Sequence, residues 1–167
     1  MIPLSTAISS GYTFSSDWQG FELQQNGQIV ATLKRPREWS SEFIAATPSG
    51  SWTIRREGFW GNKAEIRDAA SQQPIAVFKS GWGGKGSLLF ADGQAFFVLT
   101  RGCWHPIWTV TTQGGQPVLQ LHTQEKSVDV SGDAAVAGDR LTLLTLFTLY
   151  RVRQAEEAAA VAAAAPS

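Results

Sequence analysis

The sequence predicts a mainly β protein, in which about twelve antiparallel strands form a closed barrel and a C-terminal apolar helix runs through its centre. Three observations support this prediction. Short alternating segments and turn residues follow one another along residues 20–130, part of this stretch repeats itself, and a single apolar segment with a helical period comes after it. A barrel is favoured over an open sheet because closure leaves no unpaired strand edge.

The predicted strands are short segments in which apolar and polar residues alternate. Turn residues separate them, and Asn26-Gly27 is the strongest hairpin signal because both residues tolerate positive φ. A basic segment with Pro36, residues 34–38, interrupts the pattern and is expected to be an edge or a loop. The candidates are residues 20–24, 28–33, 43–45, 51–55, 64–67, 75–79, 88–90, 95–99, 107–111, 118–122 and 127–130.

An internal repeat links parts of this pattern. Segments 58–60 and 102–104 both read Gly-x-Trp and lie 44 residues apart, and each is followed by an aliphatic residue and a Gln-Pro pair. A degenerate third copy begins at Trp18. Such periodicity indicates structural units that are buried against one another. We therefore expect Trp18, Trp60 and Trp104 to brace the hairpins from the core, although exposed tryptophans in a row could instead stack on sugars.

The segment that follows the strands has the period of a helix. Thr142, Thr145 and Thr148 are three residues apart, and large apolar residues fill the positions between them. A helix that is apolar almost all round must be surrounded, and here only the strands can surround it. Asp139 is a candidate N-cap, the Ala-rich residues 155–165 extend the helix, and Pro166 ends it.

The domain prediction follows from these segments. Residues 1–154 form one barrel domain that includes the central helix, about 139–154, and residues 155–167 form an Ala-rich extension. A surface helix at an oligomer interface is the alternative, and the oligomeric state stays open.

Composition limits the function classes. Fourteen basic and fourteen acidic residues cancel, and the pI is about 6.7, so no global field favours nucleic acid or an anionic membrane, and any such affinity must come from a local patch. The single cysteine excludes an intramolecular disulfide. No secretory signal is evident, and the longest apolar stretch is well below the roughly 20 residues of a membrane-spanning helix. The expected location is the cytoplasm, either free or peripherally attached to a membrane.

No enzyme, cofactor or metal is predicted. Cys103, His105 and His122 are the candidate soft ligands, but their spacing is weak for zinc. Cys103 and His105 would share a face of an extended strand, yet no third catalytic group is evident. The glycine-rich stretch 81–87 lacks the spacing of a phosphate-binding loop and is expected to be a hairpin connection.

A local excess of basic residues gives the best ligand-binding hypothesis. Such residues attract anionic headgroups, although ordinary solvated side chains are the simpler interpretation. The candidates are Lys34, Arg35, Arg37, Arg55, Arg56, Lys79 and Lys85.

Taken together, the repeated aromatic hairpins over residues 18–33, 60–78 and 104–121 and the apolar helix over 139–152 resemble the tubby C-terminal and LURP-one-related group, which includes the phospholipid scramblases. The resemblance implies a roughly twelve-stranded barrel threaded by its C-terminal helix. It also implies a non-enzymatic module that binds anionic phospholipid headgroups or a protein partner. A β-trefoil carbohydrate-binding module is the alternative, and it requires the helix to be peripheral.

Overall fold

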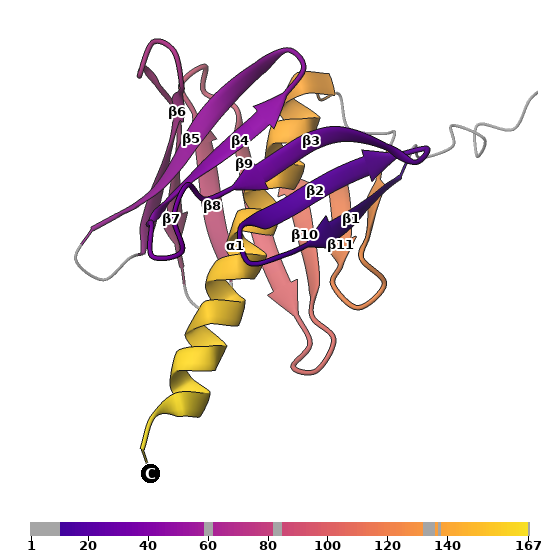
Figure 1. Cartoon of the computed structure of the whole chain (residues 1–167). Coiled ribbons are helices and arrows are strands. Elements are labelled where there is room, and N and C mark those ends of the chain that lie inside the picture. Colours follow the sequence, from indigo (N-terminus) through magenta and orange to yellow (C-terminus); the bar gives the residue numbers. More distant parts are fainter. Residues whose placement is uncertain (1–10, 59–61, 82–84, 132–135, 137, 167) are drawn as a thin grey trace, which may run out of the picture.

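The computed structural model describes residues 11–58, 62–81, 85–131, 136 and 138–166. Within these residues, twelve strands follow one another in chain order and form a closed antiparallel barrel, which β1 and β12 complete by pairing (Figure 1). The fold class predicted from the sequence is therefore confirmed. The strands are β1 (Tyr12–Ser16), β2 (Gly20–Gln25), β3 (Gln28–Lys34), β4 (Glu42–Thr47), β5 (Gly50–Glu57), β6 (Lys63–Asp68), β7 (Pro74–Ser80), β8 (Lys85–Phe90), β9 (Ala95–Arg101), β10 (Ile107–Thr112), β11 (Pro117–His122) and β12 (Ser127–Val130).

The hairpin turns explain how so short a chain makes so many strands. Asn26 and Gly27, at φ of 52° and 78°, form the tight β2–β3 turn that the sequence predicts. Three hairpins, β2–β3, β6–β7 and β10–β11, each contain one register shift, after Leu23, Ile66 and Val110. These residues, fully buried, are about 44 positions apart, which is the spacing of the sequence repeat. An extra residue at such a point bends the strand and helps a sheet to curve.

The helix α1 (Gly138–Ala164) fills the barrel. Every side chain from Leu143 to Tyr150 is buried, so this part of the helix is covered on all sides. It contacts β2, β3, β4, β10 and β11. The buried hydroxyls of Thr145 and Thr148 donate to the carbonyl oxygens of Leu141 and Leu144, at 2.9 and 2.8 Å, so no polar group is left unpaired there.

The two ends of the helix differ from each other. Arg140 fixes its start by donating to Asp92, at 2.6 Å, and by stacking 4.1 Å from the ring of Phe90. Asp139 is not the N-cap that we expected, because the helix already begins at Gly138; its carboxylate accepts from Ser49 Oγ at 3.1 Å. From Ala155 onward the helix is exposed, and it projects from the barrel (Figure 1). A central helix excludes the trefoil alternative, which requires a peripheral one.

Candidate functional site

The barrel has two unlike ends. Because the strands are antiparallel neighbours, the connections that follow β1, β3, β5, β7, β9 and β11 all belong to one end. The helix leaves through that end, where Arg153 donates to the Asp17 carbonyl at 2.7 Å and Arg35 pairs with Glu157. We call it the helix-exit end. The helix starts at the opposite end, beside the β4–β5 and β8–β9 turns.

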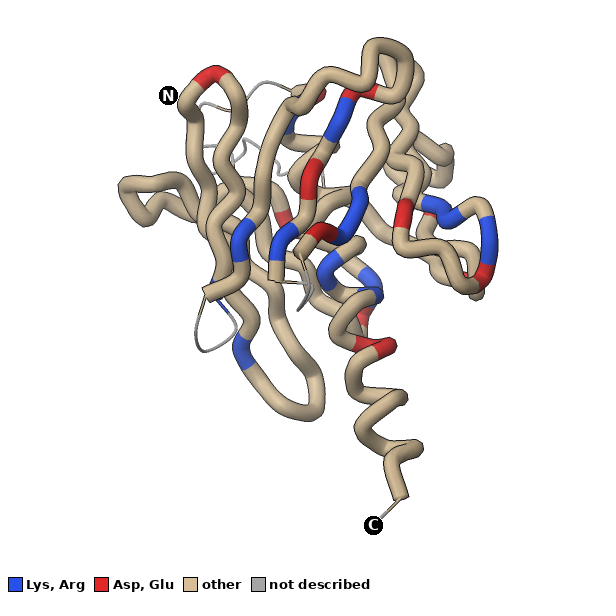
Figure 2. Tube along the Cα trace, turned by 90° about the vertical axis from the view of Figure 1, so that its left-hand side faces the viewer, with Lys and Arg blue, Asp and Glu red and all other residues tan. Residues whose placement is uncertain are grey.

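Positive charge is concentrated at the helix-exit end. Of the fourteen Lys and Arg residues, all within the described chain, only Arg67 and Arg140 lie at the opposite end. The tube view shows this distribution along the chain (Figure 2). Twelve basic side chains therefore meet nine acidic ones there, although the whole chain is neutral. The acidic residues at this end are Asp17, Glu22, Glu38, Glu42, Glu57, Glu65, Glu125, Glu156 and Glu157.

The structure brings all seven predicted basic residues to this one end, on several separate elements. Lys34, Arg35 and Arg37 lie at the end of β3 and in the β3–β4 loop. Arg55 and Arg56 lie near the end of β5, and both are exposed. Lys79 and Lys85 occupy β7 and β8, and Lys85 lies 4.9 Å from the ring of Phe97. Charged groups from different strands thus share one rim.

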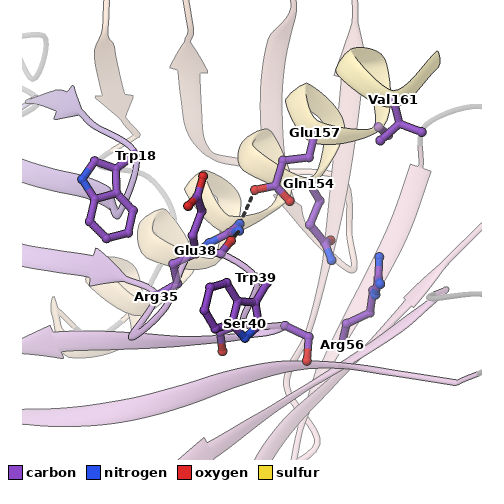
Figure 3. Close-up of a pocket in the computed structure, with 11 residues that line it drawn as sticks. Trp18, Arg35, Glu38, Trp39, Ser40, Arg56, Gln154, Glu157 and Val161 are labelled. Carbon is purple, nitrogen blue, oxygen red and sulfur yellow. Dashed lines mark hydrogen bonds and ion pairs between the residues drawn. The ribbon is translucent and has the colours of Figure 1, made fainter. Parts of the chain in front are cut away.

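An open cavity of about 740 Å³ lies at this rim, between the β3–β4 loop and the helix (Figure 3). Arg35 and Arg56 are the predicted residues that line it, together with Trp18 and Trp39. Arg35 is 8% exposed; it donates to the Glu38 carbonyl at 2.6 Å, pairs with Glu157 and stacks on Phe43, 4.6 Å from the ring centre. Arg35 therefore has a structural role, and Arg56 is the more accessible of the two cations.

Two further arginines at this end come from the helix, and sequence reasoning missed both. Arg151 stacks 4.6 Å from the ring centre of Phe78, and burial lowers the pKa of its guanidinium. Arg153 stacks on Phe21 and donates to the carbonyls of Asp17 and Trp18. Their position directly after the apolar segment was the available signal, since cations end a buried helix where it meets solvent.

The tryptophan prediction is wrong for the described residues. Trp18 is 60% exposed and Trp104 is 90% exposed, so neither braces a hairpin from the core. Both lie in connections at the helix-exit end, as does Trp39, which is 80% exposed. Trp60 lies outside the described residues, as do residues 82–84 of the glycine-rich stretch.

The candidate soft ligands are separated. Cys103 and His105 lie in the exposed loop between β9 and β10, so the expectation that they share a face of a strand is wrong. His122, at the end of β11, contacts Asp129 at 3.1 Å and Glu125 at 3.4 Å. The described residues contain no group of three or more potential metal ligands.

Comparisons with known proteins add no relative: no family model, no curated protein and no solved structure matches the chain. Within the described residues, no helix is both long enough and apolar enough to cross a bilayer. The function is therefore inferred from the geometry of the helix-exit end.

Proposed function

We propose that the protein is a non-enzymatic binding module that docks its helix-exit end on an anionic phospholipid surface. The observation that carries this proposal is the concentration of twelve of fourteen basic side chains at that end. Near an anionic membrane each Lys or Arg contributes about 1 kcal/mol. An excess of three, twelve basic against nine acidic, favours attraction at low ionic strength.

The spread of these charges favours a membrane over a protein partner. They come from β3, β5, β6, β7, β8 and β9, from the β3–β4 and β11–β12 connections and from the helix, so they surround the exit rather than form one patch. A flat anionic surface engages a whole rim at once. Membership of the tubby and LURP-one-related group is also a proposal. The binding of lipid headgroups that this resemblance implies agrees with docking on a membrane.

Co-sedimentation tests the proposal directly. Wild-type protein is mixed with vesicles of phosphatidylserine and phosphatidylcholine, or of phosphatidylcholine alone, at low and at physiological ionic strength. We expect binding to the anionic vesicles that weakens as salt rises, because screening shortens the reach of exposed charges. The absence of binding to anionic vesicles at low salt would reject the function.

A matched pair of variants tests the orientation. Arg37→Gln with Lys79→Gln removes two exposed charges from the helix-exit end. Gln28→Glu with Gln116→Glu makes the same change in net charge at exposed positions of the opposite end. The first double variant is expected to lose about thirtyfold in affinity for anionic vesicles, since it removes two charges at about 1 kcal/mol each, and the second much less. Equal losses would show that net charge acts without a preferred face.

A further inference from the structure

The helix-exit end also exposes large apolar side chains. Trp18, Trp39 and Trp104 are the described tryptophans that are mostly exposed, and all three lie in connections at this end. Tryptophan combines a large apolar ring with one polar N–H group, a combination suited to the boundary between lipid and water. Resting on the proposed function, we propose that these three side chains enter the interfacial layer of the anionic bilayer.

The loops hold these rings outward rather than leave them unstructured. Asp17 Oδ1 accepts from the backbone N–H groups of Gln19 and Gly20, at 2.9 and 3.0 Å, and so fixes the turn that carries Trp18. In the β3–β4 loop, Arg35 donates to the Glu38 carbonyl at 2.6 Å, next to Trp39. Because the loops are ordered before binding, exposing the tryptophans to lipid has little ordering cost.

The β9–β10 loop that carries Trp104 is held in the same way. Gly102 takes φ of 95°, and Thr123 Oγ1 donates to the Pro106 carbonyl at 3.0 Å. This loop therefore also presents its ring from a defined backbone.

The three rings flank the helix on two sides. In the closed order of twelve strands, the β9–β10 loop is six strands from the β3–β4 loop, so Trp104 and Trp39 stand on opposite sides of the exit. Trp18 and Trp39 line the cavity beside the helix, and Trp104 does not. A small ligand in that cavity would use two of the rings, whereas a bilayer is broad enough to engage all three.

The projecting helix is compatible with this orientation. Glu156 and Glu157, at its base, pair with Arg153 and Arg35. The last seven residues of α1, 158–164, carry no charge, and at about 1.5 Å per residue they reach about 10 Å. This is less than half of the roughly 30 Å apolar core of a bilayer, so the helix end stays within one leaflet.

Electrostatics and tryptophan insertion respond differently to salt. Attraction between charges weakens as ionic strength rises, whereas the burial of apolar rings does not. The insertion therefore predicts a part of the binding that persists at physiological salt.

The test compares two sets of substitutions in the full chain. Trp18→Ala, Trp39→Ala and Trp104→Ala together remove the rings, and Ile29→Ala with Leu89→Ala removes exposed apolar side chains from the opposite end as the control. Vesicles of phosphatidylserine and phosphatidylcholine serve as the probe. At physiological salt, the triple variant is expected to bind at least about tenfold more weakly than wild type, and the control as well as wild type.

Fluorescence gives a second measurement that does not depend on the variants. Lipids brominated near the headgroup end of the acyl chain are expected to quench wild-type tryptophan emission, and quenching is expected to fall in the triple variant. Unchanged binding by the triple variant at both salt concentrations, or no quenching in wild type, would overturn the insertion while leaving the docking of the charged end intact. Failure of wild type to bind anionic vesicles at low salt would reject both the membrane docking and the tryptophan insertion.

Discussion

The central helix can be tested through one side chain, Phe147. It is fully buried, and its ring centre lies 5.1 Å from that of Phe78 and 5.7 Å from that of Tyr150. Phe147→Ala removes the apolar area of the ring and leaves a cavity that the closed strand wall cannot collapse to fill. Such substitutions cost about 3–5 kcal/mol, and the lost ring contacts favour the upper part of that range. A domain of this kind has about 5–15 kcal/mol in total.

Urea unfolding measures this loss. The control is Val161→Ala, a truncation on the same helix at an exposed position beyond the barrel, expected to change the free energy of unfolding by less than about 0.5 kcal/mol. A large difference between the two variants would show that the helix is core only inside the barrel. A loss below about 1 kcal/mol for Phe147→Ala, with an unchanged dependence on urea, would refute the reasoning, because no central core residue is so dispensable.

Three further substitutions test separate contacts. Burial raises the pKa of Tyr150 to about 12 from 10.0, so the folded state keeps the phenol proton longer than the unfolded state. The contribution of Tyr150 to the free energy of unfolding is then full below pH 10 and falls by up to about 3 kcal/mol as pH rises toward 12. Tyr150→Phe should lack this fall when urea unfolding is measured at alkaline pH. If the free energies of wild type and variant fall in parallel, the raised pKa of Tyr150 is contradicted. Gly86→Ala would place a Cβ atom 2.1 Å from Phe78 Cζ and should cost about 1–3 kcal/mol in thermal unfolding. Gly114→Ala would place its Cβ atom in ordinary contact with Thr112 Oγ1, at 3.8 Å, and should be nearly neutral. Arg153→Met leaves the carbonyls of Asp17 and Trp18 without this donor and should cost about 1–3 kcal/mol, against little change for the exposed Arg55→Met; equal effects would deny the role of these bonds.

Most of the fold could be predicted because local patterns encode it. The two-residue alternation of the strands and the Asn26-Gly27 turn are properties of short segments, and the all-round apolar helix can only be an enclosed one. β1 was missed. Its sequence, Tyr-Thr-Phe-Ser-Ser, has one buried side chain, Phe14, so alternation is hardly visible there. Its pairing with β12 depends on closure of the whole ring.

The candidate site was predicted only in part, because it depends on which end of the barrel each residue reaches. Lys34, Arg56 and Lys85 could be recognised as basic, but their convergence requires the alternation of connections between the two ends. The tryptophans were assigned to the core since a recurring aromatic looks the same in sequence whether it braces strands or occupies equivalent loops. Trp104 directly follows Gly102-Cys103, a turn-like context that indicated a loop.

The order of elements along the chain affects how the protein folds during synthesis. The helix follows all twelve strands, and the ring closes only when β12, the last strand, finds β1, the first. The ribosome releases the chain from its N-terminus, so every hairpin emerges before α1, the helix that packs against the inner faces of the strands. We therefore expect the nascent strands to expose apolar surface until α1 has been made. This long-range requirement makes folding slow and makes loss of the helix more damaging than loss of any surface loop.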